Sequence, residues 1–471
     1  MLKPGVYELI GSLLWAVFLG ASLRVVHASD HPSVVPVHPS YFGLKMEAGP
    51  LSPGDARSIL TEDERGDEVV ARVHVQVGEN RVVLLPDGQL VVRGPDQGKP
   101  AETPFVPYQA DQLVARLKQS SFAGWQTDLT RHYVFLYQEN GAFLQVTRRI
   151  LESMLRGITA YTGARNLDVH PPEVPLVVII FPTREQFQAY HPTPDGVLAY
   201  YDVISNHILL CQESPWWPEN PELALRQSIA TIAHEGAHQI LHNIGVQQRL
   251  SLWPEWMNEG LAEFFAPTST DHRLRWKGAG EVNDLRMFEL EQLIKVQTGN
   301  AIDGQVLAQT VSAARLTSTG YATAWALTHY LAQHRRDDFR AYLRQLTRLG
   351  PLERGGEAVP PGVIPSNLRD FKGHFGTDLA DLERRLMRHL RQLPYQDPFA
   401  DWPHVVAFVA LPGSPSRTAE VFHDPDQADR WRRDRLEAIP AEYRPAARSG
   451  VREFPNRLQA EQFKSQWLFG P

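Results

Sequence analysis

Residues 221–245 read PELALRQSIATIAHEGAHQILHNIG. Their apolar side chains recur every three or four residues, which is the periodicity of a helix with one buried face. These side chains are Ile229, Ile232, Ala233, Ala237, Ile240 and Leu241. Asn220 is a favourable N-cap, and the proline and glycine at the two ends of the segment are typical of helix starts and stops. The segment therefore predicts one long amphipathic helix.

This helix carries the sequence His-Glu-Gly-Ala-His at residues 234–238. Side chains four residues apart share a helix face, so His234 and His238 can direct their imidazoles at one Zn²⁺ ion. Glu235 lies one residue further round, where its carboxylate can take a proton from a water at the metal. The alternative is a helix with two hydrogen-bonded histidines and a solvated glutamate. Because Cys211 is the single cysteine, any metal must be held by His, Asp or Glu.

A second helix is predicted from Pro254, where the chain reads PEWMNEGLAEFF. It places Glu259 and Glu263 four residues apart on one face, beside bulky apolar side chains. Carboxylates are costly to bury there without partners, and a catalytic zinc needs a third protein ligand. We therefore expect Glu259 to be that ligand and Glu263 to accept a hydrogen bond from a ligand histidine. The alternative is a solvated acidic face on an amphipathic helix.

Taken together, these two segments resemble the gluzincin class of zinc metallopeptidases. In that class the third ligand is a Glu on a following helix, and an acidic residue one turn later orients a ligand histidine. The longer strings HEGAHQ at 234–239 and WMNEGLAEF at 256–264 are similar to an uncharacterised bacterial branch of peptidase-MA-like proteins, often exported. The resemblance implies that Asn258 stands next to the ligand Glu259 as a supporting residue. It is specific over residues 225–265 and looser over residues 125–340.

Related classes differ from this chain at defined positions. Leu241 and Ile244 stand where a metzincin has Gly and His, so that class is excluded. His242 lies one turn past His238, but its side chain is rotated by about 40° round the helix, so we expect a packing or surface histidine. The Gly-Ala-Met-Glu-Asn strand of the aminopeptidase branch does not occur before the first helix. Residues 196–202 predict instead an edge strand that can bind an extended peptide.

A peptidase also needs a hydrogen-bond donor for the developing oxyanion. Tyr321 is the candidate, because it opens a helical run after Ser-Thr-Gly and because related peptidase-MA-like proteins often place a Tyr there, facing the zinc. The alternative is a tyrosine that only packs at a helix start. The expected reaction is hydrolysis of a peptide or protein substrate with one Zn²⁺ per chain. Glu235 takes a proton from the attacking water and delivers it to the leaving amine.

The first 28 residues predict a signal peptide. Residues 9–23 form an uncharged, mostly apolar run that is shorter than the about 20 residues of a bilayer span, and Val26-His27-Ala28 precedes a possible cleavage site. We therefore expect an exported protein, periplasmic, cell-surface or secreted. An uncleaved membrane anchor and a buried N-terminal helix are the alternatives. The net charge of −7 gives no basic field, so no nucleic-acid partner is expected.

The rest of the chain predicts an α+β fold in several modules. Residues 29–66 are rich in Pro, Gly and Ser and predict a linker. Residues 67–107 predict a small antiparallel β module and a following loop. Residues 125–400 alternate strands and helices before helices take over, as expected for a zincin-like domain with a small mixed sheet packed on a helical half. Residues 401–471 contain two similar strand–helix segments and predict a small α+β module.

The sequence thus favours an exported zinc endopeptidase and leaves three alternatives. One is a catalytically silent peptidase-like domain that acts as an extracellular binding module. Another is a structural metal site, although two His and one Glu leave an open coordination position, unlike closed structural sites. The third is a zinc hydrolase of a non-peptide amide or ester, because the metal chemistry would be the same.

Overall fold

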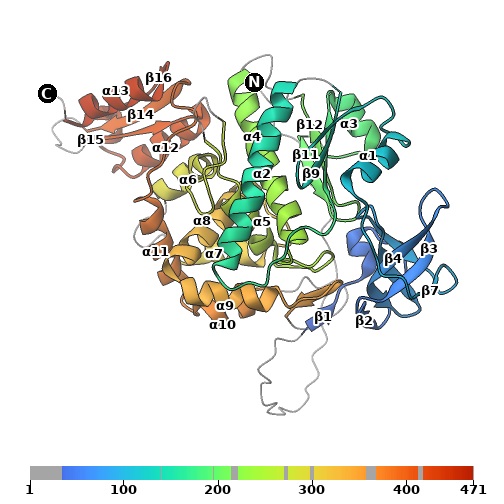
Figure 1. The fold of residues 1–471 in the computed structure, drawn as a ribbon. Coiled ribbons are helices and arrows are strands. Elements are labelled where there is room, and N and C mark those ends of the chain that lie inside the picture. Colours follow the sequence, from blue (N-terminus) through green and yellow to red (C-terminus); the bar gives the residue numbers. More distant parts are fainter. Residues whose placement is uncertain are drawn as a thin grey trace, which may run out of the picture.

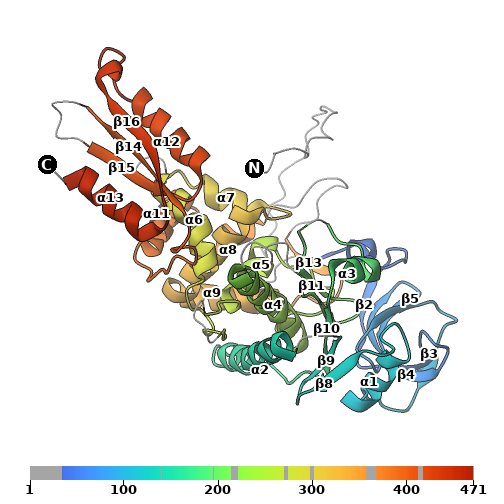
Figure 2. The same cartoon turned by 90° about the horizontal axis from the view of Figure 1, so that it is seen from above.

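The computed structural model describes residues 34–138, 141–194, 196–213, 221–269, 274–296, 302–356, 367–411 and 417–469. The predicted signal peptide and Asn220 lie outside these residues. None of the helices within them is both long and apolar enough to cross a bilayer. The protein is α+β, and Figures 1 and 2 show an N-terminal β module and a C-terminal module at opposite ends of a larger central domain.

The N-terminal module is an antiparallel sheet. Its strands are β2 (Leu51–Pro53), β3 (Ser58–Glu62), β4 (Glu68–Val77), β5 (Asn80–Leu84), β6 (Leu90–Arg93) and β7 (Lys99–Ala101). The order is β6-β5-β4-β3-β7, with β2 also paired to β4. The meander expected within residues 67–107 is confirmed as β4, β5 and β6. The linker expected over residues 29–66 is wrong from residue 34 onward, because β2 and β3 pair with β4 and bury Ile59 and Thr61.

The N-terminal segment is also fastened to the central domain. Strand β1 (Val34–Pro36) pairs antiparallel with β13 (Glu353–Gly355). The amide of Val37 donates to the carbonyl of Leu352 at 2.7 Å, and the amide of Leu252 donates to the carbonyl of Glu353 at 2.8 Å. A 3₁₀ turn, η1 (Pro39–Phe42), follows β1. These hydrogen bonds therefore join the N-terminal segment to β13, and they join β13 to the loop before the second predicted helix.

The central domain begins with a mixed five-stranded sheet. Its strands are β8 (Gln126–Leu129), β9 (Tyr133–Tyr137), β10 (Leu176–Phe181), β11 (Ala199–Asp202) and β12 (His207–Cys211), in the order β11-β12-β10-β9-β8. Strands β9, β10 and β12 are parallel, and the two edge strands run antiparallel to their neighbours. Alternate residues face two cores. One core holds α2 (Gly141–Gly163) and α4 (Pro221–Asn243), and the other holds α1 (Ala110–Lys118) and α3 (Arg184–Tyr190).

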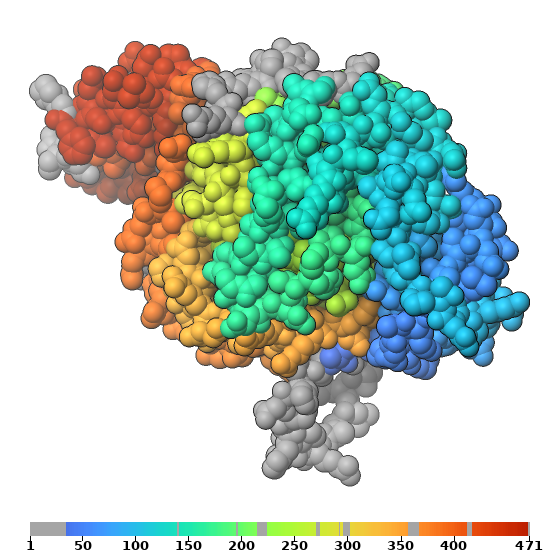
Figure 3. Space-filling model, viewed as in Figure 1, coloured from blue at the N-terminus to red at the C-terminus, as the bar shows by residue number. Residues whose placement is uncertain are grey.

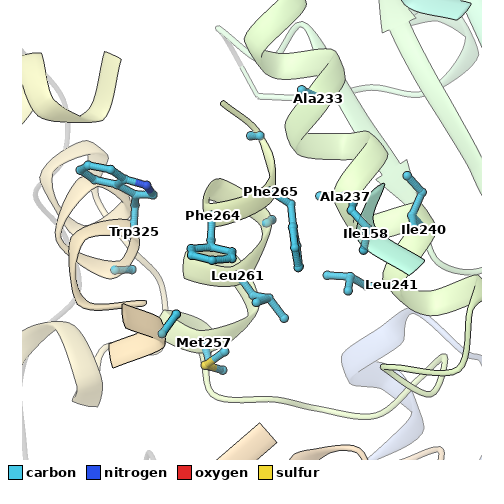
Figure 4. Packing of buried hydrophobic residues seen from close by; sticks show 14 of the residues in the cluster. Ile158, Ala233, Ala237, Ile240, Leu241, Met257, Leu261, Phe264, Phe265 and Trp325 are labelled. Carbon is cyan, nitrogen blue, oxygen red and sulfur yellow. The ribbon is translucent and has the colours of Figure 1, made fainter. Parts of the chain in front are cut away.

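The helical half of the domain packs on α4. Its further helices are α5 (Glu255–Phe265), α6 (Asp284–Val296), α7 (Gln305–Ser312), α8 (Ser318–His334), α9 (Arg336–Leu346), α10 (Leu368–Phe375) and α11 (Leu379–Leu390). Figure 4 shows Phe264 and Phe265 of α5 between Trp325 of α8 and Leu241 of α4. This apolar sandwich fixes the two predicted helices, α4 and α5, against each other.

Two glycines allow the helices to approach closely. A Cβ added at Gly260 would lie 2.7 Å from the carbonyl oxygen of Ala324 on α8. A Cβ added at Gly236 would lie 2.3 Å from Cδ2 of Leu151 on α2. Gly260 is therefore required by the close approach of the α8 backbone, whereas Gly236 leaves room for the side chain of Leu151.

The C-terminal module is a three-stranded antiparallel sheet with one helix on each face. Its elements are β14 (His404–Ala410), β15 (Arg417–Phe422), α12 (Pro425–Glu437), η3 (Arg444–Ala446), β16 (Arg448–Phe454) and α13 (Arg457–Phe469), and the strand order is β15-β14-β16. The two predicted strand–helix segments are β15-α12 and β16-α13. Helix α12 packs on Val405 and Ala407, whereas α13 packs on Val406 and Phe408. Figure 3 shows the module projecting from one end of the central domain.

Candidate metal centre

Three side chains from α4 and α5 converge on one point. Nε2 of His234 lies 3.2 Å from Nε2 of His238 and 3.1 Å from Oε2 of Glu259, and the third separation, from His238 Nε2 to Glu259 Oε2, is 3.4 Å. Zinc ligands at 2.0–2.2 Å on the corners of a tetrahedron are about 3.3 Å apart. The donor set and its spacing therefore fit a tetrahedral Zn²⁺ with three protein ligands.

The positions of these ligands follow from the local sequence. His234 and His238 are one turn apart on α4, as the four-residue spacing predicted. The buried amide of Gln239 anchors the helix to the sheet, because its Nε2 donates to the carbonyls of Val177 at 3.1 Å and Asn206 at 2.8 Å. These bonds thus hold the face of α4 that carries His234 and His238 at a fixed distance from β10 and β12.

The carboxylate of Glu259 has a second partner on its outer side. Nδ2 of Asn258 donates to Oε1 of Glu259 at 2.8 Å, which leaves Oε2 directed at the two histidines. Asn258 was expected next to this ligand only from the family resemblance. This hydrogen bond holds the carboxylate of Glu259 in the orientation described.

Glu263 lies behind His234. Its Oε1 is 2.9 Å from Nδ1 of His234, 2.6 Å from Nη2 of Arg286, and its Oε2 accepts from Nδ2 of Asn283 at 2.9 Å. Burial raises the pKa of Glu263, but Arg286 and His234 outweigh burial and lower that pKa to about 2. An ionised Glu263 favours the His234 tautomer that carries its proton on Nδ1 and presents a lone pair on Nε2.

Arg286 and Asn283 were not found by the sequence analysis. They lie at the start of α6, the next helix along the chain after the one that carries Glu263. The Asn-Asp pair at residues 283–284 is a helix-start signal, but nothing in it indicates the direction of the side chains. Their convergence on Glu263 is a product of the tertiary fold.

Glu235 points from α4 toward the edge strand β11. Its Oε2 accepts a hydrogen bond from the backbone amide of Tyr201 at 2.7 Å. Burial raises the pKa of Glu235, which increases the basicity of its carboxylate. The predicted edge strand at residues 196–202 corresponds to β11, at one margin of the central sheet.

Tyr321 lies in the same cleft, in the first turn of α8. The cleft has a volume of ≈ 310 Å³, and its walls include Tyr321, His234, Glu235, His238 and Glu259. The Tyr321 ring centroid is 6.1 Å from that of His234. Burial and the surrounding carboxylates raise the pKa of Tyr321, so its hydroxyl stays protonated and can donate. The structure thus brings together all seven residues selected from the sequence.

His242 lines this cleft without joining the ligand group. Its ring stacks on Tyr201 with a centroid distance of 5.5 Å. Burial and the proximity of His238 lower the pKa of His242 to about 3, so the imidazole is neutral. The prediction of a packing histidine is confirmed.

A second group of ligand-type residues was missed by the sequence analysis. Asp397, His404 and His423 bring three such atoms within 4.8 Å of one another at the junction of the C-terminal module and α6. Here Nη1 of Arg457 lies 2.7 Å from Oδ2 of Asp397 and 2.6 Å from Oε1 of Glu291. The guanidinium therefore supplies the positive charge of this cluster, which ties the module to the central domain.

Comparisons with known proteins match only part of the chain to a family. Residues 228–353, which contain the whole ligand group and Tyr321, match a family described as "Protein of unknown function (DUF1570)". No curated protein matches the chain. Two structures of a functionally unknown conserved protein from Bacillus anthracis str. Ames, one of them a mutant, share 11% sequence identity with it, over 78% of this chain and 80% of that chain. Their TM-score of 0.21 is too low to support a shared fold.

Proposed function

We propose that this protein is an exported, zinc-dependent endopeptidase of the gluzincin type. The observation that carries the proposal is the set of three separations, 3.1, 3.2 and 3.4 Å, between ligand atoms of His234, His238 and Glu259. They agree with the about 3.3 Å expected around a tetrahedral zinc. The outer partners Asn258 and Glu263 support the same interpretation, because metal ligands are usually held by such hydrogen bonds.

Each of the residues in the cleft would have a separate role in the reaction. Bound zinc supplies Lewis acidity, which acidifies water and polarises a carbonyl group. Glu235 would take the proton of the attacking water and return it to the leaving amine. The amide of Tyr201 would hold the carboxylate of Glu235 on the side of the cleft where the substrate enters. Tyr321 would donate its hydroxyl proton to the oxyanion in a hydrogen bond.

The edge strand favours a polypeptide substrate. Among the described residues, strand β11 pairs with β12 on one side and with no strand on the other, so its outer edge can bind an extended chain by main-chain hydrogen bonds. Because Glu235 bonds to Tyr201 on this strand, such a chain would run beside the proposed base. A small amide or ester would not need this edge.

Export is the part of the proposal that rests on the sequence alone. The apolar run of residues 9–23 and the small residues before Ser29 support cleavage of a signal peptide. N-terminal sequencing of the protein from fractionated cells would test it. A mature chain beginning near Ser29 outside the cytoplasm is expected, whereas an intact Met1 in the cytoplasm would contradict export.

The decisive experiment measures metal content and proteolysis together. The wild-type protein, Glu235→Gln and the exposed-site control Glu281→Gln are purified, assayed for zinc and incubated with unfolded casein. We expect one zinc per chain in all three and cleavage in all but Glu235→Gln, whose loss should exceed about 100-fold because it removes the general base. Zinc without cleavage in the wild type would contradict a general endopeptidase and favour a binding module. No zinc, with none rebound on titration, would contradict the metal centre.

A further inference from the structure

A second cavity lies beside the ligand cleft. It has a volume of ≈ 340 Å³ and shares four wall residues with the cleft, namely Tyr41, Leu252, Trp253 and Glu255. The two spaces are therefore adjacent across these side chains. The second cavity contains none of the residues assigned to zinc or to proton transfer.

The walls of this cavity are mainly apolar. Trp253, Pro254, Tyr342 and Leu346 contribute rings and aliphatic carbon from the loop before α5 and from α9. Its size is at the lower end of ligand sites, which suits one large side chain rather than an extended ligand. Two carboxylates, Glu255 and Asp370, and one guanidinium, Arg354, are also part of the lining, so its charged groups do not share one sign and do not favour a charged side chain of either sign.

The distance from the metal ligands suits a neighbouring residue of the substrate. Glu255 lies one helical turn before Glu259 on α5, so the cavity mouth is about 5–6 Å from that ligand. An extended peptide advances about 3.3 Å per residue. A side chain in the cavity would therefore belong to a residue within about two positions of the scissile bond.

Tyr41 forms part of the walls of both the cavity and the cleft. It lies outside residues 228–353, the segment that matches the family. Its side chain is 59% exposed, yet it contributes to the walls of the cavity and of the cleft. Its position is fixed by the β1–β13 pairing and by Gly43, whose φ of 75° ends the turn that carries Tyr41. The N-terminal segment thus closes the substrate cleft of the central domain.

We propose that this cavity is the specificity subsite, that it takes a large apolar side chain such as Phe or Leu next to the scissile bond, and that Tyr41 determines this preference. The proposal rests on the proposed endopeptidase function and names its substrate class. Burial of a Phe or Leu side chain would favour such peptides over those with Ala by about 10- to 100-fold in kcat/KM.

The test uses quenched fluorescent peptides that carry Phe, Leu, Ala, Arg or Asp at each position flanking one cleavable bond. Wild-type protein should prefer Phe and Leu at one position within two residues of the bond. Tyr41→Ala should reduce the Phe-to-Ala ratio of kcat/KM about tenfold, mainly through KM, because it removes one wall of the subsite. Tyr443→Ala is the matched control, since Tyr443 is 54% exposed in the C-terminal module.

A second variant fills the cavity instead of opening it. Ala314 is an exposed residue of the cavity wall, so Ala314→Trp should lower kcat/KM for Phe peptides by a larger factor than for Ala peptides and thereby remove the preference for Phe. Ala438→Trp, at the end of α12, is the control for adding an exposed indole. Binding of the Phe and Ala peptides to Glu235→Gln, measured by fluorescence anisotropy, gives a readout that needs no turnover.

The outcomes separate this proposal from the endopeptidase itself. Cleavage without apolar preference, or with preference for Arg or Asp, would overturn the subsite and leave the endopeptidase. An apolar preference unchanged by Tyr41→Ala and Ala314→Trp would place the specificity elsewhere and also overturn it. A third outcome is that no peptide is cleaved but Glu235→Gln binds Phe peptides about tenfold more tightly than Ala peptides. That result would support the subsite and contradict the endopeptidase.

Discussion

Two groups of histidines and carboxylates in this protein bring three ligand-type atoms within 4.8 Å of one another, but their surroundings differ. Among the described residues, no Lys or Arg side chain bonds to the converging atoms of His234, His238 and Glu259. At the second group, Arg457 lies 2.7 Å from Asp397. Similar residue types at similar spacing therefore stand in different electrostatic surroundings. The two groups differ in whether the chain itself supplies the positive charge.

The ring nitrogens do not separate the two groups. Nδ1 of His234 lies 2.9 Å from Glu263 and its Nε2 lies 3.1 Å from Glu259. In the second group, Nδ1 of His404 faces the carbonyl of Trp402 at 2.7 Å and Nε2 faces Asp397 at 3.3 Å. Both histidines thus have an oxygen atom at each ring nitrogen, and the feature that distinguishes the second group is the guanidinium of Arg457.

The largest expected effect comes from removing one ligand of the first group. His238→Ala should lower zinc affinity by more than about 100-fold, because even loss of an outer partner costs 10- to 100-fold. Zinc should then no longer raise the melting temperature of the variant. At a zinc concentration of 100 times the Kd, zinc should stabilise the wild-type protein against unfolding by about 2.7 kcal/mol. Asp397→Asn is the comparison, and its zinc content should equal that of the wild type. Loss of zinc in Asp397→Asn but not in His238→Ala would reverse the comparison.

Removal of the guanidinium should have the next largest effect. Arg457→Ala leaves the carboxylates of Asp397 and Glu291, whose side chains are only 4% and 9% exposed, without their cation. Breaking a buried pair on one side typically costs about 3–5 kcal/mol. Urea unfolding should show this loss, and zinc titration of the variant should show a second, weaker site.

An ion pair whose carboxylate is less buried provides the control for that variant. Lys464 and Glu420 are 3.1 Å apart with side chains 23% exposed, so Lys464→Ala should cost at most about 1 kcal/mol. Equal effects of the two substitutions would show that the second group is an ordinary surface ion pair. A change in zinc content of Lys464→Ala would likewise argue against the assignment.

A smaller effect is expected from the outer partner of the metal centre. Glu263→Gln keeps the size of the side chain but removes the charge that orients His234 and pairs with Arg286. Zinc affinity should fall about 10- to 100-fold, measured by competition with a chromophoric chelator. Glu289→Gln also removes a partner of Arg286, but Glu289 does not contact His234, so zinc affinity should change little. An unchanged affinity in Glu263→Gln would assign Glu263 to packing alone.

A third set of histidines, whose imidazoles hydrogen-bond to one another, makes the stability of the protein depend on pH. Nδ1 of His329 is 2.9 Å from Nε2 of His389, whose Nδ1 is 3.0 Å from Nε2 of His334. Burial, with repulsion between the rings, lowers the pKa of His329 and His389 to about 4. Both are neutral in the folded protein and gain protons on unfolding below their ordinary pKa of about 6.5. The stability they contribute is therefore complete above about pH 6.5 and is lost as the pH falls toward 4.

Urea unfolding between pH 7 and pH 5 measures this effect. His389→Gln should flatten the dependence of unfolding free energy on pH by up to about 1.4 kcal/mol per pH unit, because one fewer proton is taken up. His38→Gln, at an exposed position, is the control. Equal slopes for wild type and His389→Gln would mean that His389 is already protonated in the folded state.

The parts of the fold and site that the sequence predicted were local. The periodicity of residues 221–245 is sufficient for α4, and four-residue spacing places His234 with His238 and Glu259 with Glu263. Tyr321 was selected because a helical run was predicted to begin with it and because of the family resemblance; in the structure it lies in the first turn of α8, which begins at Ser318. The two spacing inferences need only the geometry of one helix.

The parts that were missed depend on pairing between distant segments. Strand β3 is short and partly polar, and its partner β4 is needed to show that Ile59 faces a core. Arg457 meets Glu291 across 166 residues, and no local pattern indicates that contact. Tyr41 reaches the cleft only because β1 pairs with β13. Residue composition identified none of these contacts, because each of these side chains could equally lie on the protein surface.

The pairing of β1 with β13 has a consequence for the order in which the molecule is built. Val34 is synthesised long before its partner Gly355, and closing so long a loop costs conformational entropy that local helices such as α4 do not incur. The wall that carries Tyr41 can therefore form only after most of the chain has left the ribosome. A newly made chain would have α4 and α5 before it has a complete cleft, so the fold itself delays the assembly of the cleft until late in folding.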